Sequence, residues 1–185
     1  MIQSKTDYLN YLEADRVANH APKRYKYSLL CRIEGGYNFL YLKCLRKVEY
    51  VLNCKKSAWT KIELKLLNIR LKRLSVLTGI SIPPNTFGKG LYIPHWGSIV
   101  VNGSACFGDN CVVQSGVNVS ENVKGGNHLY LGAGAKILIG VTIADDVIIA
   151  ANAVVNKNVT DPNIVVGGIP AKKISDKGFK NRDKV

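Results

Sequence analysis

Histidine side chains are the first candidates for chemistry in this chain, because imidazole can accept a proton near neutral pH. The chain of 185 residues has three of them, His20, His95 and His128. His95 lies in the segment Pro94–Gly97, where two extra residues interrupt a regular apolar pattern. Such an interruption commonly places a side chain outside the regular core, where it can act on a bound molecule. His95 is therefore the candidate general base, whereas His20 is expected at the surface.

The pattern that His95 interrupts has a period of six residues. From Val101 to Val155 nine of the ten residues at every sixth position are large and apolar, and the residue four places after each of the ten is apolar. The first series is Val101, Phe107, Val113, Val119, Gly125, Leu131, Ile137, Ile143, Ile149 and Val155, and the second is Ala105, Cys111, Val117, Val123, Leu129, Ala135, Val141, Val147, Ala153 and Val159. This period predicts a parallel β-helix, in which three hexads close one triangular turn of about 18 residues. Ordinary antiparallel β-structure is the alternative.

Residues 1–79 follow a helical pattern instead. Apolar residues recur at spacings of three and four within residues 40–52 and 62–74, which predicts amphipathic helices. Gly35 and Gly36 break this region, and Gly79 ends it. We expect a mainly β fold with three or four N-terminal helices over residues 1–79, a β-helix over 80–160, and a terminal segment over 161–185.

The distribution of charge along the chain bears on the kinds of partner that it could bind. Of the net charge of +13, residues 1–79 carry +10 and residues 80–185 carry +3. The basic region is either a solvated helical surface or a surface for an anionic partner such as the phosphates of CoA or an acidic sugar. It contains no nucleic-acid recognition motif, so no nucleic-acid partner is expected, while a position near anionic membrane lipid stays open.

Five cysteines without metal-ligand spacing predict free buried thiols and no metal site. No apolar run reaches the ~18 residues that a membrane span needs, and the N-terminus is polar. A cytoplasmic location is therefore expected.

Several segments resemble the hexapeptide-repeat acyltransferases, specifically their serine acetyltransferase-like branch. They are Ile82–Leu91, Ile93–Asn102, Leu131–Ile137 and the terminator Gly167–Lys172. Tyr11–Arg16 is also similar to serine acetyltransferases of bacterial surface-polysaccharide clusters. The resemblance implies a left-handed β-helix, a homotrimer with active sites between neighbouring copies, and acetyl-CoA as the acetyl donor.

The resemblance also implies roles for individual residues. His95 would deprotonate the acceptor hydroxyl as a general base. Small residues would lie along the pantetheine of CoA and two lysines would meet its phosphates; these are Ser120, Ala133, Ala151, Lys172 and Lys173. Three further residues are expected near the acceptor, namely Asp15, Trp96 and His128. The imidazole of His95 could be oriented by Glu13, by Asp15 or by a backbone carbonyl.

Two departures from serine acetyltransferase bear on the acceptor. That enzyme has an aspartate directly before its catalytic histidine and another fifteen residues before it, where this chain has Pro94 and Ile80. Without these carboxylates the ammonium group of free serine would lack a partner. We therefore expect an O-acetyltransferase acting on a sugar of a surface polysaccharide or its precursor, with serine O-acetyltransferase of cysteine biosynthesis as the alternative. An amine acceptor and a non-catalytic binding module stay open.

Overall fold

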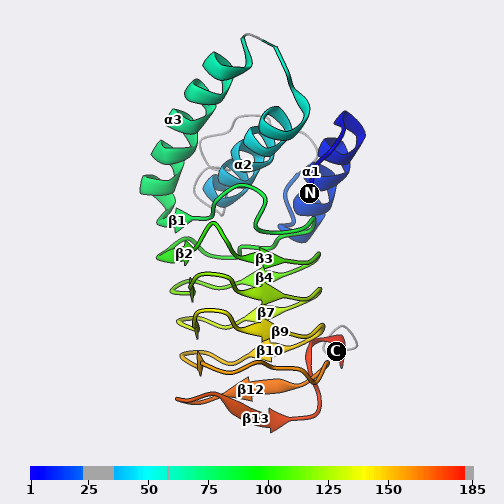
Figure 1. The fold of residues 1–185 in the computed structure, drawn as a ribbon, viewed down its shortest axis with the longest axis vertical. Coiled ribbons are helices and arrows are strands. Elements are labelled where there is room, and N and C mark those ends of the chain that lie inside the picture. The colour runs from blue at the N-terminus through cyan, green and yellow to red at the C-terminus, as the bar shows by residue number, and fades with distance from the viewer. Residues whose placement is uncertain (23–35, 58, 182–185) are drawn as a thin grey trace.

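The computed structural model describes residues 1–22, 36–57 and 59–181, which form a group of helices stacked on one end of a β-helix (Figure 1). The three α-helices in this part of the chain are α1 (Lys5–Ala18), α2 (Gly36–Cys54) and α3 (Thr60–Thr78). Ser4 caps α1 by accepting a hydrogen bond from the N–H of Asp7 at 3.0 Å. Gly79 ends α3 in the left-handed conformation, with φ of 69°.

Short strands follow, and each contributes one rung to one of three sheets (Figure 1). Sheet A contains, in spatial order, β1 (Ile80–Ser81), β2 (Ile99–Val101), β5 (Asn118–Val119), β8 (Lys136–Ile137) and β11 (Val154–Val155). Sheet B contains β3 (Cys106–Phe107), β6 (Lys124–Gly125) and β9 (Thr142–Ile143). Sheet C contains β13 (Lys172–Ser175), β12 (Val165–Gly167), β10 (Ile148–Ile149), β7 (Tyr130–Leu131) and β4 (Val112–Val113). The chain visits the sheets in the order A, B, C, so the predicted parallel β-helix is confirmed.

The interior of the coil is filled by the two apolar series. Every member of the second series and every member of the first except Gly125 is buried. The exception has a steric cause, because a Cβ at Gly125 would lie 2.1 Å from Cδ1 of Phe107. The Phe107 ring stacks on Phe87 with centroids 4.6 Å apart, so two aromatic rings occupy the space that a larger residue at position 125 would need.

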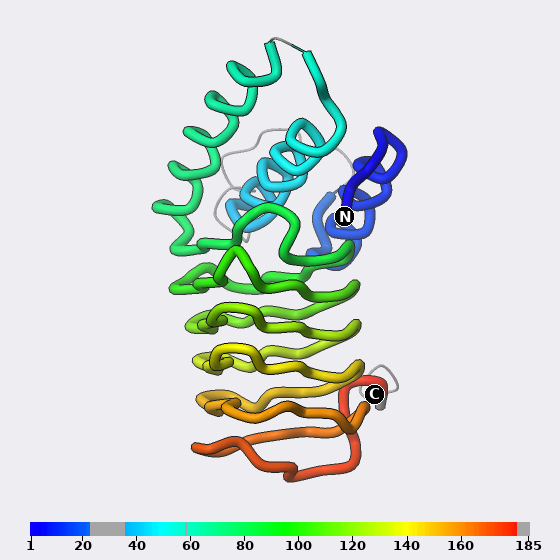
Figure 2. Tube along the Cα trace, viewed as in Figure 1, coloured from blue at the N-terminus to red at the C-terminus, as the bar shows by residue number. Residues whose placement is uncertain are grey.

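Both ends of the coil are covered (Figure 2). At the last coil, β13 turns back and pairs with β12 in the antiparallel direction. At the first coil, the helices pack on residues 80–93, and α2 supplies a run of buried side chains that includes Tyr41, Leu42 and Leu45.

A buried ion cluster joins the helices to the first coil. The guanidinium of Arg46 on α2 donates to Asp15 on α1 at 2.8 Å and to Glu49 at 3.0 Å. It also donates to the carbonyl oxygen of Phe87 at 2.9 Å, and the N–H of Leu91 donates to Asp15 at 2.9 Å. Burial opposes a charge here, but the two carboxylates raise the pKa of Arg46 above its ordinary value, so the guanidinium stays charged.

Candidate active site

The corner that carries His95 is longer than the corners stacked below it. In the first coil Tyr92 pairs with Val112, 20 residues later, whereas Val100 pairs with Asn118, 18 residues later. The two extra residues therefore lie between these positions, at the corner where the chain passes from sheet C to sheet A. His95 and Trp96 are both exposed on this corner, as an interruption of the repeat predicts.

The N-terminal helices fix the backbone on which this corner begins. Asn19 accepts a hydrogen bond from the N–H of Ile93 at 3.2 Å, and Asn38 on α2 donates to the carbonyl oxygen of Ile93 at 3.0 Å. Both polar groups of the residue two places before His95 are thus held by asparagines from the helical region. The position of His95 depends on this region as well as on the coil.

The end of the corner is held by a close approach of two backbones. The N–H of Gly97 donates to the carbonyl oxygen of Thr78 at 2.8 Å. A Cβ at Gly79 would lie 3.0 Å from the carbonyl carbon of Gly97, so a side chain at position 79 would push the corner away from α3. The last turn of α3 and the His95 corner therefore form one packed unit.

No side-chain partner orients the imidazole of His95 within the residues that the structure describes. Ile80 is completely buried inside the first coil, and Pro94 is half-buried at the corner. Glu13 is exposed and pairs with Arg16 at 2.7 Å. A single copy of the chain thus leaves His95 open to solvent.

One coil below His95, a groove of about 420 Å³ runs along the same edge of the coil. Its lining includes the predicted residues Ala133 and Ala151 together with Gln114, Tyr130 and Gly132. At Gly132 a Cβ would lie 2.6 Å from the carbonyl oxygen of Ile149, so only glycine allows the coils to stack this closely. The small residues leave an open, mostly apolar channel that suits a pantetheine chain.

Ser120 does not lie on this edge. It lines a second groove with Asn118, Glu121 and Ile139, at the corner where the chain passes from sheet A to sheet B. In a single copy, Ser120 is therefore separated from Ala133 and Ala151 by the width of sheet A. One copy cannot bring these three residues against the same ligand.

The two terminator lysines differ in their surroundings. Lys173 on β13 lies 2.5 Å from Asp176 and 3.9 Å from Asp161, so its ammonium group already has anionic partners. Lys172 is exposed, and no ion pair involves it within the described ranges. Of the two, Lys172 offers the more available charge for a phosphate.

Asp15 and His128 lie apart from His95. Asp15 is completely buried in the ion cluster, where both its carboxylate oxygens are engaged by protein groups. The Nδ1 atom of His128 lies 2.7 Å from Asp146, and its ring stacks on Phe179 with centroids 4.2 Å apart. His128 occupies the corner between sheets B and C, at the opposite edge of sheet C from His95.

The cysteines lie at different depths in the structure. Of the cysteines that the structure describes, Cys44, Cys54, Cys106 and Cys111 are free; Cys44 and Cys111 are buried as predicted, whereas Cys54 is partly exposed and Cys106 is exposed. Cys31 lies outside the described residues.

Among the described residues no group of three or more His, Cys, Asp or Glu side chains could hold a metal ion. In the same part of the chain, no helix combines the length and apolar content that crossing a bilayer requires.

Two lining residues of the groove were missed from the sequence. Tyr130 precedes the inward-facing Leu131, and Gln114 follows the inward-facing Val113. Because side chains alternate between the two faces of a strand, these neighbours face outward from sheet C. Their positions in the six-residue repeat, directly before or after an inward-facing residue, would have located them in the sequence.

Comparisons with known proteins agree with this architecture. No family model matches the chain. The serine acetyltransferase of Synechococcus elongatus is 33% identical over 114 residues, covering 57% of this chain and 46% of that protein. The chain spans about half the length of the curated relatives it matches.

Solved structures extend the likeness to almost the whole chain. Serine acetyltransferase from Brucella abortus in complex with coenzyme A aligns with a TM-score of 0.73 at 23% identity, covering 95% of this chain and 70% of that one. The Neisseria gonorrhoeae enzyme in complex with serine aligns with a TM-score of 0.70 at 24% identity, covering 93% and 71%. The fold they share is a left-handed β-helix, as the resemblance implied.

The expectation of a sugar acceptor is wrong. The curated relatives are serine acetyltransferases, and two structural neighbours are bound to serine. The missing carboxylates at positions 80 and 94 were too narrow a basis for excluding serine. The repeat, the His95 corner and these relatives together confirm the resemblance to the serine acetyltransferase-like type of hexapeptide-repeat acyltransferases.

Proposed function

We propose that the chain is an acetyl-CoA-dependent O-acetyltransferase whose acceptor is the hydroxyl group of L-serine. The observation that carries the proposal is the exposed His95 on a lengthened corner, directly above a groove lined by small residues. Relatives at 33–36% identity that are serine acetyltransferases support the choice of acceptor.

The residues of the groove fit a CoA thioester. Ala133 and Ala151 would lie along the pantetheine arm, and Lys172 would approach a phosphate of CoA. Acetyl-CoA supplies an activated acetyl group when it is bound. His95 accepts the proton of the serine hydroxyl at an imidazole nitrogen, which turns the hydroxyl oxygen into a competent nucleophile. After transfer the same nitrogen returns the proton to the leaving thiolate.

The complete site requires more than one copy of the chain, and we propose the homotrimer that the resemblance implies. Ser120 lies on one edge of sheet A, and Ala133 and Ala151 lie on the other. Packing neighbouring coils side by side would bring the Ser120 edge of one copy to the Ala133 edge of the next. The exposed side chains of Val100, Leu138 and Ile139 would then be covered.

The test is the release of CoA thiol from acetyl-CoA in the presence of L-serine. Wild-type protein should turn over, and His95→Asn should lower kcat by roughly 10²–10⁴-fold, the usual contribution of a general base. His20→Asn is the matched control, because His20 is exposed and its left-handed φ of 51° tolerates asparagine. Light scattering of the same samples measures the number of copies. Absence of serine-dependent thiol release, or an active His95→Asn variant, would overturn the proposal.

A further inference from the structure

Helix α3 has two apolar faces, and only one of them is covered by the rest of the described chain. Leu71, Leu74 and Thr78 are buried, and Leu64 and Leu67 pack against the core. On the opposite face lies a second row of large apolar residues, which we call the apolar stripe. It consists of Trp59, Ile62, Leu66, Ile69, Val76 and Leu77, whose exposed fractions run from 42% to 86%.

The spacing of the apolar stripe follows the helix. Steps of four and three residues lead from Ile62 to Leu66, Ile69, Arg73 and Val76, so these side chains line one face, which is apolar except at Arg73. A surface helix of a globular domain normally has one such face. A second one, exposed over 19 residues, indicates an apolar environment outside the described chain.

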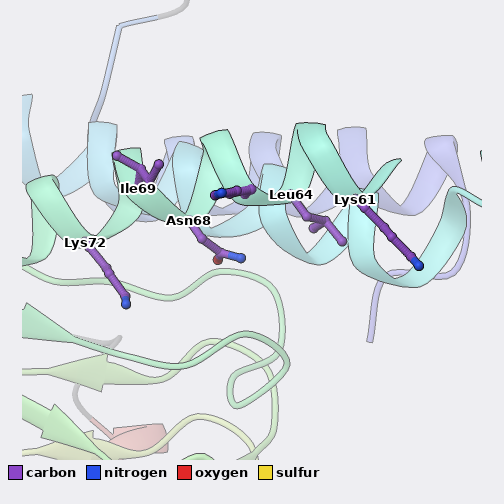
Figure 3. Close-up of a pocket in the computed structure, with 6 residues that line it drawn as sticks. Lys61, Leu64, Asn68, Ile69 and Lys72 are labelled. Carbon is purple, nitrogen blue, oxygen red and sulfur yellow. The ribbon is translucent and has the colours of Figure 1, made fainter. Parts of the chain in front are cut away.

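Basic side chains border the stripe. Lys61, Lys65 and Lys72 are exposed along one side, where they border a shallow groove of about 550 Å³ that also contains Leu64 and Ile69. Figure 3 shows Lys61 and Lys72 reaching out from α3 in the same general direction, with Asn68 between them. Arg70 is exposed as well, and Arg73 is exposed within the row of the stripe itself. The single acidic residue of α3, Glu63, is already paired with Lys55 at 2.8 Å.

This combination identifies the partner by its chemistry. A second copy of α3 would bring two rows of lysines and arginines together without carboxylates to neutralise them. A nucleic acid would neutralise the charges but would not cover large aliphatic side chains. Anionic lipid does both, because its acyl region accepts the stripe while its headgroups meet the lysines and arginines. Trp59 at the start of the helix is a residue type enriched at membrane interfaces.

We propose that α3 is a docking surface for an anionic lipid bilayer, on which the helix lies flat in the interfacial region. Figure 1 shows α3 on the side of the helical region that lies away from α1. Insertion in the plane of the membrane needs an amphipathic helix and does not need a spanning one. The proposal is independent of the proposed acceptor, because it rests on α3 alone.

The experiment is flotation of the full chain with phosphatidylcholine vesicles that contain or lack phosphatidylglycerol, at low and at high salt. Two variants test the two features separately: Leu66→Ser/Ile69→Ser for the stripe and Lys61→Gln/Lys65→Gln/Lys72→Gln for the charge. Matched controls are Leu9→Ser/Val17→Ser on the exposed face of α1 and Lys124→Gln/Lys157→Gln/Lys177→Gln on the coil and its tail. Circular dichroism and serine-dependent thiol release of each variant show whether it is folded.

Wild-type protein should float with the anionic vesicles and stay unbound with phosphatidylcholine alone. Each α3 variant should lower the fraction of protein bound to anionic vesicles about tenfold. Binding has two contributions of comparable size, apolar insertion and electrostatic attraction, and each variant removes one of them. The controls should bind like wild type. Failure of wild type to bind anionic vesicles would overturn the proposal, as would equal losses in the controls. A sedimentation mass that falls in the stripe variant would instead assign the face to a second copy. Binding to duplex DNA that needs the lysines but not Leu66 and Ile69 would assign it to nucleic acid.

Discussion

Replacing Arg46 by methionine should strongly destabilise the protein. The substitution keeps the length and apolar stem of the side chain but removes its guanidinium group. The carboxylates of Asp15 and Glu49, whose side chains are 0% and 2% exposed, would then be left without their cation. Breaking a buried pair by removing one partner costs roughly 3–5 kcal/mol. The carbonyl oxygens of Phe87 and Gly88 also lose a donor, which places the expected cost in the upper part of that range.

At about 2–4 °C per kcal/mol for a chain of this size, the melting temperature should fall by roughly 8–20 °C. Thermal and urea unfolding followed by far-UV circular dichroism measure the loss. Arg16→Met is the matched control, because Arg16 also pairs with a glutamate three residues away but at the surface, and its decrease should be much smaller.

A triple variant separates charge from packing. Arg46→Met/Asp15→Asn/Glu49→Gln removes all three buried charges at once, so it should recover a large part of the stability that Arg46→Met loses. If the triple variant is as unstable as the single one, or if Arg46→Met melts like wild type, the uncompensated-charge reasoning is refuted.

Three further predictions concern the corner, the coil and the thiols. Asn38→Ala removes the donor to the carbonyl oxygen of Ile93 and should lower kcat for serine roughly tenfold or more, because small misplacements of a catalytic group are costly. Steady-state kinetics should show a KM for acetyl-CoA close to that of wild type. An unchanged kcat would show that Asn38 is not a positioning residue. Gly125→Val should lower the free energy of unfolding by about 1–3 kcal/mol, because the new side chain clashes with Phe107. Adding Phe107→Val should recover part of this stability in thermal unfolding. A Gly125→Val variant as stable as wild type would contradict the packing of Phe107 over Gly125. Burial raises the pKa of Cys111 to about 12, so its thiolate is scarce at pH 8. In the folded protein Cys111 should therefore resist alkylation, while the exposed Cys106 should react. Peptide mapping after iodoacetamide treatment measures the labelling of both cysteines, and rapid labelling of Cys111 in the folded protein would contradict its burial.

The coil and the His95 corner were predictable because each depends on local spacing. An inward residue at every sixth position repeats one physical requirement many times, and two extra residues after Ile93 disturb that count visibly. The edge of the coil on which a small residue lies follows from the same six-residue repeat. One turn of the coil takes eighteen residues, so residues eighteen apart lie on the same edge. By that count Ser120 belongs to a different edge from Ala133 and Ala151, although all three are small residues at turns.

The joint between helices and coil was not predictable in this way. Asp15, Arg46 and Glu49 carry charges that, in a helical sequence pattern, are typical of a solvated surface. Their burial depends on the backbone groups of the first coil, which lie about 40 to 75 residues further along the chain. The sequence suggested Asp15 as a contact for the acceptor because only tertiary packing reveals its partner. The same holds for Asn38, whose link to the His95 corner spans 55 residues.

The reversal of the last strand limits how far this architecture can extend. A stack of parallel rungs has no intrinsic stopping point, and a bare final rung would present a row of backbone donors and acceptors to any similar edge. Here β13 covers β12 in the opposite direction, and its two lysines lie along the outer margin of the sheet. Charged side chains on a terminal strand disfavour the addition of another chain, so the segment proposed to meet CoA also protects the protein against fibre growth.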